Sequence, residues 1–273
     1  MLDLSKEYLS KFHSLIEEGK DRALIKKLET LHANDIALIL NQIKRDDVHY
    51  LYRLLSDDAR SDVLAELDEE VREDLLATLT SKEIAEDVID GLASDDAADI
   101  ISELSSEKIE EVFAHVKDKE SVSDVQSLLE YPEGTAGALM ATELVQVEET
   151  WSVARAVKEI RVQAEDIENL YTIYVVDKKG KLTGRLSLQN LLLSSKSART
   201  PIGDIIDSDE TVWINSNENE DLVVSLMERY DLVALPVVDD DGVLLGRITI
   251  DDAVDVIIEE AERDYQLASG ISE

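Results

Sequence analysis

Apolar and polar positions repeat with a period of about twelve residues through the first half of the chain. Each unit opens on Ser, Thr or Asp and ends on an apolar residue, as in SDDARSDVLAEL (56–67). The opening residue is a good helix N-cap, and an apolar pair inside each unit supplies one buried face. Repetition of such units predicts an acidic superhelix of stacked short helices. The closing apolar positions are Leu55, Leu67, Leu79, Leu92, Leu104 and Val116.

The stretch YPEGTAGALM (131–140) interrupts this period with the first proline and two glycines, which predicts a domain boundary. Beyond it, VVDKKGKLTGRLSLQNLLL (175–193) aligns without gaps on VVDDDGVLLGRITIDDAVD (237–255), an offset of 62 residues. Each copy predicts a strand, a glycine turn, a second strand and a helix, with another helix upstream. The expected fold class is α+β: an all-α superhelix, two β-α-β-β-α domains and a C-terminal connecting helix. Their predicted bounds are 1–131, 132–200, 201–258 and 250–273.

Acidic residues dominate the composition. The 62 Asp and Glu against 27 Lys and Arg give a net charge of −35, which repels nucleic-acid phosphate. The chain has no cysteine, which removes disulfides and zinc–thiolate sites. It also lacks the GxSxG, GxGxxG and phosphate-loop motifs, so an enzyme is not expected. The charge is uneven, because residues 1–131 carry −18, residues 132–200 carry zero and residues 201–264 carry −16.

One predicted helix, ASDDAADIISEL (93–104), carries all its acids on one side. At about 100° per residue, Asp95, Asp96, Asp99 and Glu103 fall opposite the apolar positions. Asp95 and Asp99 stand one turn apart, so both can approach one ion, and Mg²⁺ prefers carboxylate oxygens with retained waters. Acids in a first helical turn also favour the helix dipole, which accounts for Asp95 and Asp96 without any ligand.

The terminal helix IDDAVDVIIEEAERDYQ (250–266) also has an acidic face, formed by Asp252, Asp255, Glu259 and Glu262. An amphipathic helix with a solvated side has the same pattern, so the spacing alone leaves a structural role open.

The copy pair resembles tandem CBS domains. The second copy has the fuller motif, LPVVD followed by GVLLGRITIDD. The first copy has Ser187 and Asn190 where the second has Thr249 and Asp252, and Tyr174 stands in place of the proline. The resemblance implies an adenine-nucleotide site, because Thr249 and Asp252 occupy the positions that contact phosphate and ribose in CBS relatives. ATP or another adenosine ligand is therefore an alternative, or an addition, to a metal.

The order of an acidic helical array, the YPEGTAGALM junction and the CBS pair resembles the cytosolic regulatory region of the MgtE family of magnesium transporters. The resemblance covers nearly the whole chain. It implies Mg²⁺ as the bound ion, a location at the cytoplasmic face of the cell membrane, and a transmembrane domain that is absent from this sequence. CBS pairs commonly dimerise, so a homodimer through the CBS domains is expected, with no nucleic-acid partner.

In this family, magnesium sites lie between the helical domain and the second CBS copy. Ala138 stands where the family pattern has a second glycine, and a contact through its backbone carbonyl would survive that change. Glu228 and Asp231 end a helix, where an acid is more commonly a helix stop, so the resemblance alone supports them as ligands. The implied metal residues are Asp62, Asp95, Asp99, Ala138, Glu228, Asp231, Asp252, Asp255 and Glu260.

The mechanism that these residues suggest is electrostatic. Without Mg²⁺, like charge separates the helical domain from the CBS pair; with Mg²⁺, bridging draws them together and positions the terminal helices to close the missing pore. Two alternatives stay open. One is a CBS-type nucleotide-binding module, and the other is a superhelical interaction scaffold whose shape does not depend on Mg²⁺.

Overall fold

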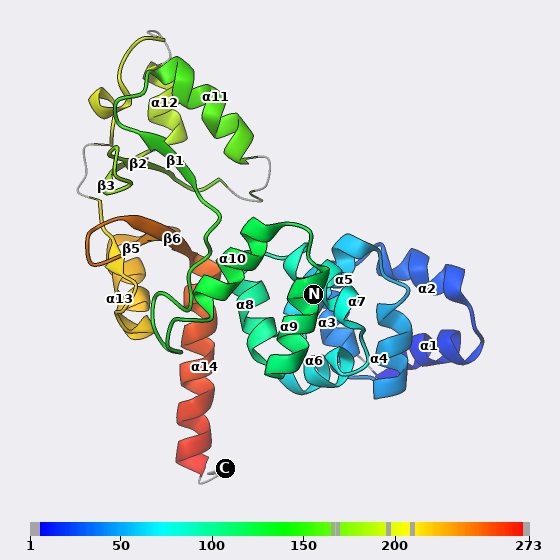
Figure 1. The fold of residues 1–273 in the computed structure, drawn as a ribbon. Coiled ribbons are helices and arrows are strands. Elements are labelled where there is room, and N and C mark those ends of the chain that lie inside the picture. Colours follow the sequence, from blue (N-terminus) through cyan, green and yellow to red (C-terminus); the bar gives the residue numbers. More distant parts are fainter. Residues whose placement is uncertain (1–5, 165–166, 168–169, 195–197, 208–210, 270–273) are drawn as a thin grey trace. The chain divides into compact units, whose positions relative to one another are not determined.

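The computed structural model divides the chain into two compact units, residues 1–126 and 127–273 (Figure 1). The residues that it describes are 6–164, 167, 170–194, 198–207 and 211–269.

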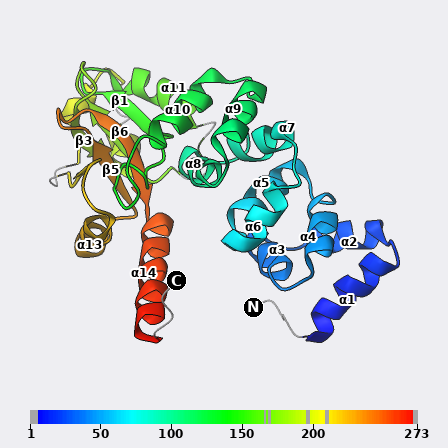
Figure 2. The same ribbon diagram turned by 60° about the horizontal axis from the view of Figure 1, so that its bottom comes forward.

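The first unit consists of helices throughout its described residues. Figure 2 shows them following one another from the blue N-terminal end to the green end of the unit. Most have eight to ten residues, as a twelve-residue repeat with a short corner requires. The helices are α1 (Lys6–Glu17), α2 (Asp21–Leu28), α3 (Ala33–Leu40), α4 (Arg45–Tyr52), α5 (Asp57–Ala65), α6 (Glu69–Leu76), α7 (Ser81–Ile84), the π-helix η1 (Ala85–Ile89), α8 (Ser94–Ser102), α9 (Ser106–His115) and α10 (Lys119–Leu128).

The repeat works as the pattern predicts. Most of these helices begin after a polar residue, although α8 begins after Ala93. Two of the polar residues cap the following helix: the Ser105 hydroxyl accepts from the Lys108 backbone N–H, and Thr80 forms a capping box with Glu83. The closing apolar positions Leu55, Leu67 and Leu79 are buried, while the three later ones are partly buried. Helices two apart in the sequence pack together, as α3 does with α5 and α7 with α9.

A buried ionic network joins three of these helical segments. The Asp87 side chain, on η1, is 2% exposed. One carboxylate oxygen accepts from the Tyr52 hydroxyl at 2.9 Å, and the other accepts from Arg60 Nε at 3.0 Å. Arg60 also pairs with the exposed Asp57 at 2.9 Å. The network connects Asp87 on η1 to Arg60 on α5, 27 residues earlier in the sequence, and to Tyr52 on α4, 35 residues earlier.

The second unit contains two three-stranded sheets of the same design. In each, the first strand is parallel to the second and the second is antiparallel to the third, in the orders β1-β2-β3 and β4-β5-β6. The elements are β1 (Val145–Glu148), α11 (Val153–Gln163), β2 (Ile173–Val176), β3 (Leu182–Leu186), α12 (Leu188–Ser194), the 3-10 turn η3 (Ile202–Asp204), β4 (Ile214–Asn215), α13 (Glu220–Tyr230), β5 (Ala234–Val238), β6 (Leu244–Thr249) and α14 (Ile250–Ser269).

The two copies meet at their glycine turns. The backbone N–H of Leu182 donates to the Gly242 carbonyl, and that of Leu244 donates to the Gly180 carbonyl, both at 3.0 Å. The repeat-related turns therefore hold each other in the same way, as the 62-residue alignment suggests. The α+β fold class is confirmed. Within the described residues, no helix has the length and apolar character needed to cross a membrane.

The junction before β1 packs on the second copy. The backbone N–H groups of Ala136 and Gly137 donate to the carbonyls of Glu218 and Ser216, each at 2.8 Å. The junction therefore contacts the second copy although it directly precedes the first in the sequence, which a linear pattern cannot reveal.

The Asp87 network predicts a large loss of stability. Asp87→Ala leaves Arg60 and Tyr52 without a buried partner, so we expect the free energy of unfolding of the first unit to fall by about 3 kcal/mol. Urea unfolding followed by far-UV circular dichroism measures this. Asp57→Ala is the matched control, because it removes the other carboxylate on Arg60 where the Asp57 side chain is 91% exposed, and it should leave the midpoint nearly unchanged. Equal losses from both variants would contradict the assignment.

Candidate functional site

The acids of α8 lie on its outer side, as predicted. Ala97, Ile100 and Ile101 are buried, while Asp95 is half-buried and Asp99 is exposed. Oδ1 of Asp95 accepts from the Asp96 backbone N–H at 3.0 Å, so part of its role is to order the first turn of its own helix. In the same unit, Asp62 is exposed on α5.

Glu103, which the sequence pattern placed on this acidic face, has a cationic partner. Its Oε1 accepts from Arg72 Nε at 2.9 Å, and both side chains are 16% exposed. Arg72 also donates to the carbonyls of Ala65 and Leu67, so it ties α6 to the preceding corner and to the end of α8. A structural ion pair therefore accounts for Glu103. Because its two partners are 31 residues apart in the sequence, a local pattern cannot predict the pair.

Asp252 caps the helix that carries it. Its Oδ2 accepts from both the backbone N–H and the hydroxyl of Thr249, at 2.7 and 2.9 Å. The two residues that the sequence assigns to nucleotide contact are therefore bonded to each other at the start of α14. Asp255, one turn further on, is largely exposed, but partial desolvation of its carboxyl and, second, the charge of Asp251 raise its pKa.

Asp231 ends α13 in a left-handed conformation, with φ of 51°. It is the one non-glycine residue in the described chain with positive φ, which fits the helix-stop reading. Asp231 and Glu228 are both exposed, in the last turn and cap of the same helix. Ala138 lies half-buried in the junction, where its N–H donates to the Thr135 carbonyl at 3.0 Å.

An acidic group that sequence reasoning missed lies where α13 and α14 pack together. Burial raises the pKa of Glu220; Arg263 opposes this shift, while Glu259, Asp221 and Glu260 add to it. Glu260 therefore lies near a partly buried acid of the preceding helix. The sequence places Glu220 in a first helical turn, where the dipole explains it, so only the tertiary contact reveals this crowding.

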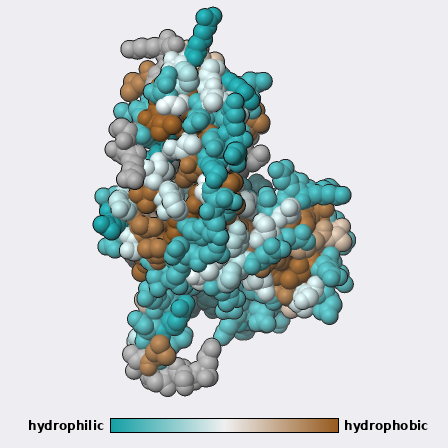
Figure 3. Space-filling view, turned by 60° about the vertical axis from the view of Figure 1, so that its left-hand side comes forward, coloured by the Kyte–Doolittle hydropathy of each residue, from teal (hydrophilic) through white to brown (hydrophobic). Residues whose placement is uncertain are grey.

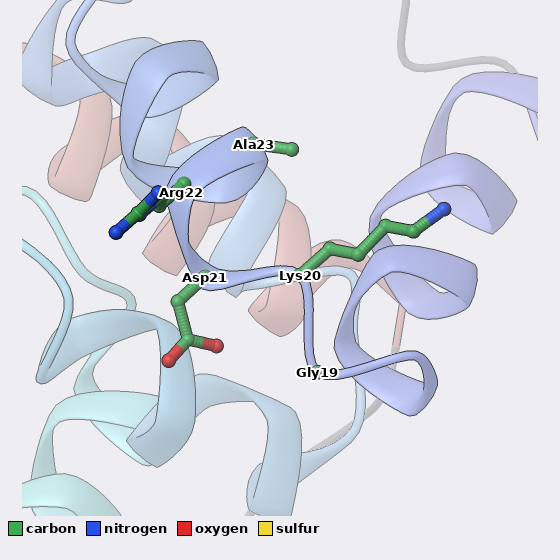
Figure 4. Close-up of a pocket in the computed structure, with 5 residues that line it drawn as sticks. All are labelled: Gly19, Lys20, Asp21, Arg22 and Ala23. Carbon is green, nitrogen blue, oxygen red and sulfur yellow. The ribbon is translucent and has the colours of Figure 1, made fainter.

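No complete metal centre forms from these acids alone. Among the described residues, no group of three or more His, Cys, Asp or Glu side chains lies close enough to hold an ion. The surface hollow at the α1–α2 corner, lined by residues 19–23, is no better candidate. Figure 4 shows that its Lys20 and Arg22 side chains point away from each other, and Asp21 is engaged by the Tyr50 hydroxyl.

In the first CBS copy, Asp207 supplies from outside the motif the carboxylate that the motif itself lacks. Oδ1 of Asp207 accepts from the Ser187 hydroxyl and backbone N–H, each at 3.2 Å, and from Asn190 Nδ2 at 2.6 Å. Asp207 therefore serves Ser187 as Asp252 serves Thr249 in the second copy. It comes from a segment 17 residues beyond Asn190, so the motif comparison could not identify it.

Tyr174, at the centre of β2, is 1% exposed, and its hydroxyl has no hydrogen-bond partner among the described residues. Burial raises the pKa of Tyr174 to about 12, although Arg247 and Arg185 act in the opposite direction. Arg247 also lines a small cavity with Leu144, Val145, Ile167, Leu170, Tyr171 and Thr172.

Comparison with known proteins identifies related chains for both units. Residues 31–134 match the model of the MgtE intracellular N domain, and residues 136–196 and 202–259 match the CBS domain. The magnesium transporter MgtE of Thermus thermophilus is 34% identical over 250 residues, which cover 91% of this chain and 55% of that protein. The magnesium transporter MgtE of Bacillus subtilis is 31% identical over 260 residues, with 92% and 55% covered. The chain thus spans about half the length of these relatives.

Solved structures agree over the same extent. A crystal structure of the cytosolic domain of the Mg²⁺ channel MgtE in complex with ATP has a TM-score of 0.82 and 32% identity, covering 91% of this chain and 99% of that one. A crystal structure of the soluble part of a magnesium transporter has a TM-score of 0.78 and 26% identity, covering 94% and 99%.

The left-handed Asp231 gives a stability prediction. Glycine adopts positive φ without the steric cost that a Cβ imposes, so Asp231→Gly should raise the free energy of unfolding of the second unit by up to about 1 kcal/mol. Asp231→Ala, which keeps the Cβ and loses the polar side chain, should lower it. Chemical denaturation without divalent cations measures both, and a stabilising alanine would contradict the backbone argument.

Proposed function

The chain belongs to the MgtE family of magnesium transporters, and from this premise we propose that it is the cytosolic, Mg²⁺-sensing regulatory region of such a transporter. Transporters are not enzymes, in agreement with the missing catalytic motifs. The relatives named as magnesium transporters are nearly twice as long as this chain, so the pore that it would regulate lies in a membrane domain outside it.

The observation that carries this proposal is the charge and chemistry of the two units. Both are strongly acidic, and the candidate ligands offer oxygen atoms only, which suits a hard cation. Neither unit supplies three clustered acids within its described residues. Mg²⁺ commonly takes one or two carboxylates and keeps its waters. Sites with few carboxylates from each unit are therefore consistent with Mg²⁺ held between acids of both units. The proposed ligands are Asp62, Asp95 and Asp99 of the first unit with Asp231, Asp252 and Asp255 of the second.

The mechanism follows from like charge. At low Mg²⁺, the carboxylates of the two units repel each other and favour separation of the units. At high Mg²⁺, the same carboxylates share cations, and the compact arrangement becomes the more stable one because it alone offers ligands from both sides. Movement of α14, which carries Asp252, Asp255 and Glu260, would pass this change to the membrane domain. Weak, water-retaining sites suit a sensor that must release its ions.

A homodimer through the CBS helices belongs to the same proposal. Brown surface in Figure 3 marks hydrophobic residues exposed among hydrophilic ones. Repeat-equivalent positions of the two copies are exposed and apolar, Leu188 with Ile250 and Leu192 with Val254, at 41–64% exposure. A second copy would cover both sets at once, as a symmetric interface requires.

The sensor proposal predicts magnesium-dependent compaction. In small-angle scattering of the whole chain, the radius of gyration should fall as Mg²⁺ rises through the millimolar range, and NaCl of equal ionic strength should not reproduce the fall. Asp95→Ala/Asp99→Ala should raise the Mg²⁺ midpoint by roughly tenfold, because it removes two charged ligands.

Glu69→Ala/Glu73→Ala is the matched control for this double variant. It also removes two exposed carboxylates one turn apart, on α6, and changes the net charge equally. Its midpoint should stay within about twofold of the parent. A profile that Mg²⁺ leaves unchanged would instead favour the interaction scaffold.

Adenine-nucleotide binding is a second candidate function. It is favoured by the similar structure solved with ATP and by the carboxylate that Asp207 brings to Ser187 and Asn190. A carboxylate at that place supplies the acceptor that a ribose hydroxyl needs, and Arg247 beside the small cavity supplies a cation for phosphate. The strong negative charge of the chain makes Mg²⁺ a natural companion of the nucleotide.

The nucleotide candidate predicts a dependence on Asp207. Asp207→Ala should weaken ATP binding by roughly tenfold in titration calorimetry with Mg²⁺ present, because a hydrogen bond to a charged group is lost. Asp204→Ala, a nearby exposed acid, serves as the control and should leave the affinity unchanged. Absence of any ATP heat from the parent protein would exclude this function and leave the magnesium proposal intact.

A further inference from the structure

A close contact inside the first unit lies beside the candidate acids. Gly91 is in the corner between η1 and α8, and Ser61 is on α5. A Cβ placed on Gly91 would lie 2.1 Å from the Ser61 hydroxyl oxygen and 2.8 Å from its Cβ, far inside contact distance. Gly91 is not among the glycines with positive φ, so close approach, and not backbone conformation, is the reason that it must be glycine.

The buried Asp87 network connects the same two segments, α5 and the segment that ends at Gly91. Arg60 precedes Ser61 on α5, and Asp87 lies four residues before Gly91. Their ion pair at 3.0 Å and the Ser61–Gly91 contact therefore join one turn of α5 to the η1–α8 corner. Ser61 is itself 3% exposed, so surrounding atoms restrict its movement away from Gly91.

The Ser61–Gly91 contact and the Arg60–Asp87 pair together are called the joint below. Candidate ligands follow it in the sequence on both segments. Asp62 follows Ser61, and Asp95 and Asp99 stand in the first two turns of the helix that starts after the Gly91 corner. A change in the separation of α5 from this corner would therefore be expected to alter the position of Asp62 relative to the α8 acids. Ligand positions must be kept to within about 0.5 Å for a site to retain its affinity.

We propose that Ser61, Gly91 and the Arg60–Asp87 pair are positioning residues that fix the spacing between Asp62 and the Asp95/Asp99 pair, and thereby set the Mg²⁺ sensitivity of the chain. This inference rests on the proposed magnesium-sensing function. None of these four residues needs to touch an ion, because each acts through the helix that carries the acids.

The test uses a suppressor pair. Gly91→Ala should push α5 away from the corner and raise the Mg²⁺ midpoint of compaction by at least about fivefold. Ser61→Gly/Gly91→Ala removes the two nearest atoms that the new methyl group meets and leaves only the Asp87 carbonyl oxygen, at 3.1 Å. It should therefore return the midpoint to within about twofold of the parent even though glycine weakens α5. Rescue assigns the shift of the midpoint to the Ser61–Gly91 contact, and the stability control described below separates it from a general loss of stability.

A second measurement follows the joint without Mg²⁺. The chain has no cysteine, so spin labels at Glu66→Cys, which directly follows α5, and at Ser102→Cys, the last residue of α8, report the distance between the ends of these two helices. That distance should change in Gly91→Ala and return in the suppressor pair. Val48→Ala, a core truncation on α4, is the stability control and should lower the unfolding midpoint without moving the Mg²⁺ midpoint.

The outcomes separate the two proposals. An unchanged label distance in Gly91→Ala, or a changed distance with the parental Mg²⁺ midpoint, overturns the positioning role. Failure of the parent chain to compact overturns the sensing function instead, and the label distances still decide whether the joint sets the spacing. If Gly91→Ala does not fold, Asp87→Asn, which keeps the shape and removes the charge on which Arg60 depends, tests the same joint with the same readouts.

Discussion

Repulsion among carboxylates is the interaction around which this molecule is organised. With 62 acids and 27 basic side chains, acids outnumber cations by more than two to one. Two arginines of the first unit pair with acids of other helical segments. Arg60 pairs with Asp87 and Arg72 pairs with Glu103, and each pair joins segments about 30 residues apart in the sequence. The remaining charge is left on outer faces, where water screens it only in part. Each unit is compact by itself, and the proposed response to a divalent cation would follow from the charge that the basic residues leave unbalanced.

Local pattern was sufficient to predict the repeating helices and strands of both units, although not the π-helix η1 or the 3-10 turn η3. The twelve-residue repeat depends on N-caps and apolar pairs that lie within one helix, and the 62-residue repeat contains each strand, turn and helix in full. The partners of Glu103 and Ser187 were less accessible to such reasoning. Arg72 and Asp207 reach their sites from other elements, and Glu220 becomes crowded only because α13 packs on α14. Sequence reasoning found which acids face outward but not which of them already serve the fold.

The double assignment of Asp252 illustrates how a structural and a ligand role can share one side chain. Both hydrogen bonds from Thr249 end on the same oxygen, Oδ2. A carboxylate has about four acceptor sites on two oxygens, so capping α14 uses only part of its capacity. The cap also fixes the orientation of the carboxylate, which lowers the entropy that a bound ion or ribose hydroxyl would otherwise have to remove. A helix cap at this position is therefore compatible with recognition.

The acids with raised pKa values indicate where added positive charge would have most effect. Burial raises the pKa of both Asp255 and Glu220, and neighbouring acids add to it. A carboxyl with a raised pKa holds its proton more tightly in the folded state than in the unfolded chain, so the folded state loses stability as pH rises through that folded pKa. Wherever these carboxyls are ionised, their charges are a cost to the α13–α14 pair. A cation near them would offset this cost only where the protons have left, so under the proposed function these acids are where a bound Mg²⁺ would stabilise the helix pair most.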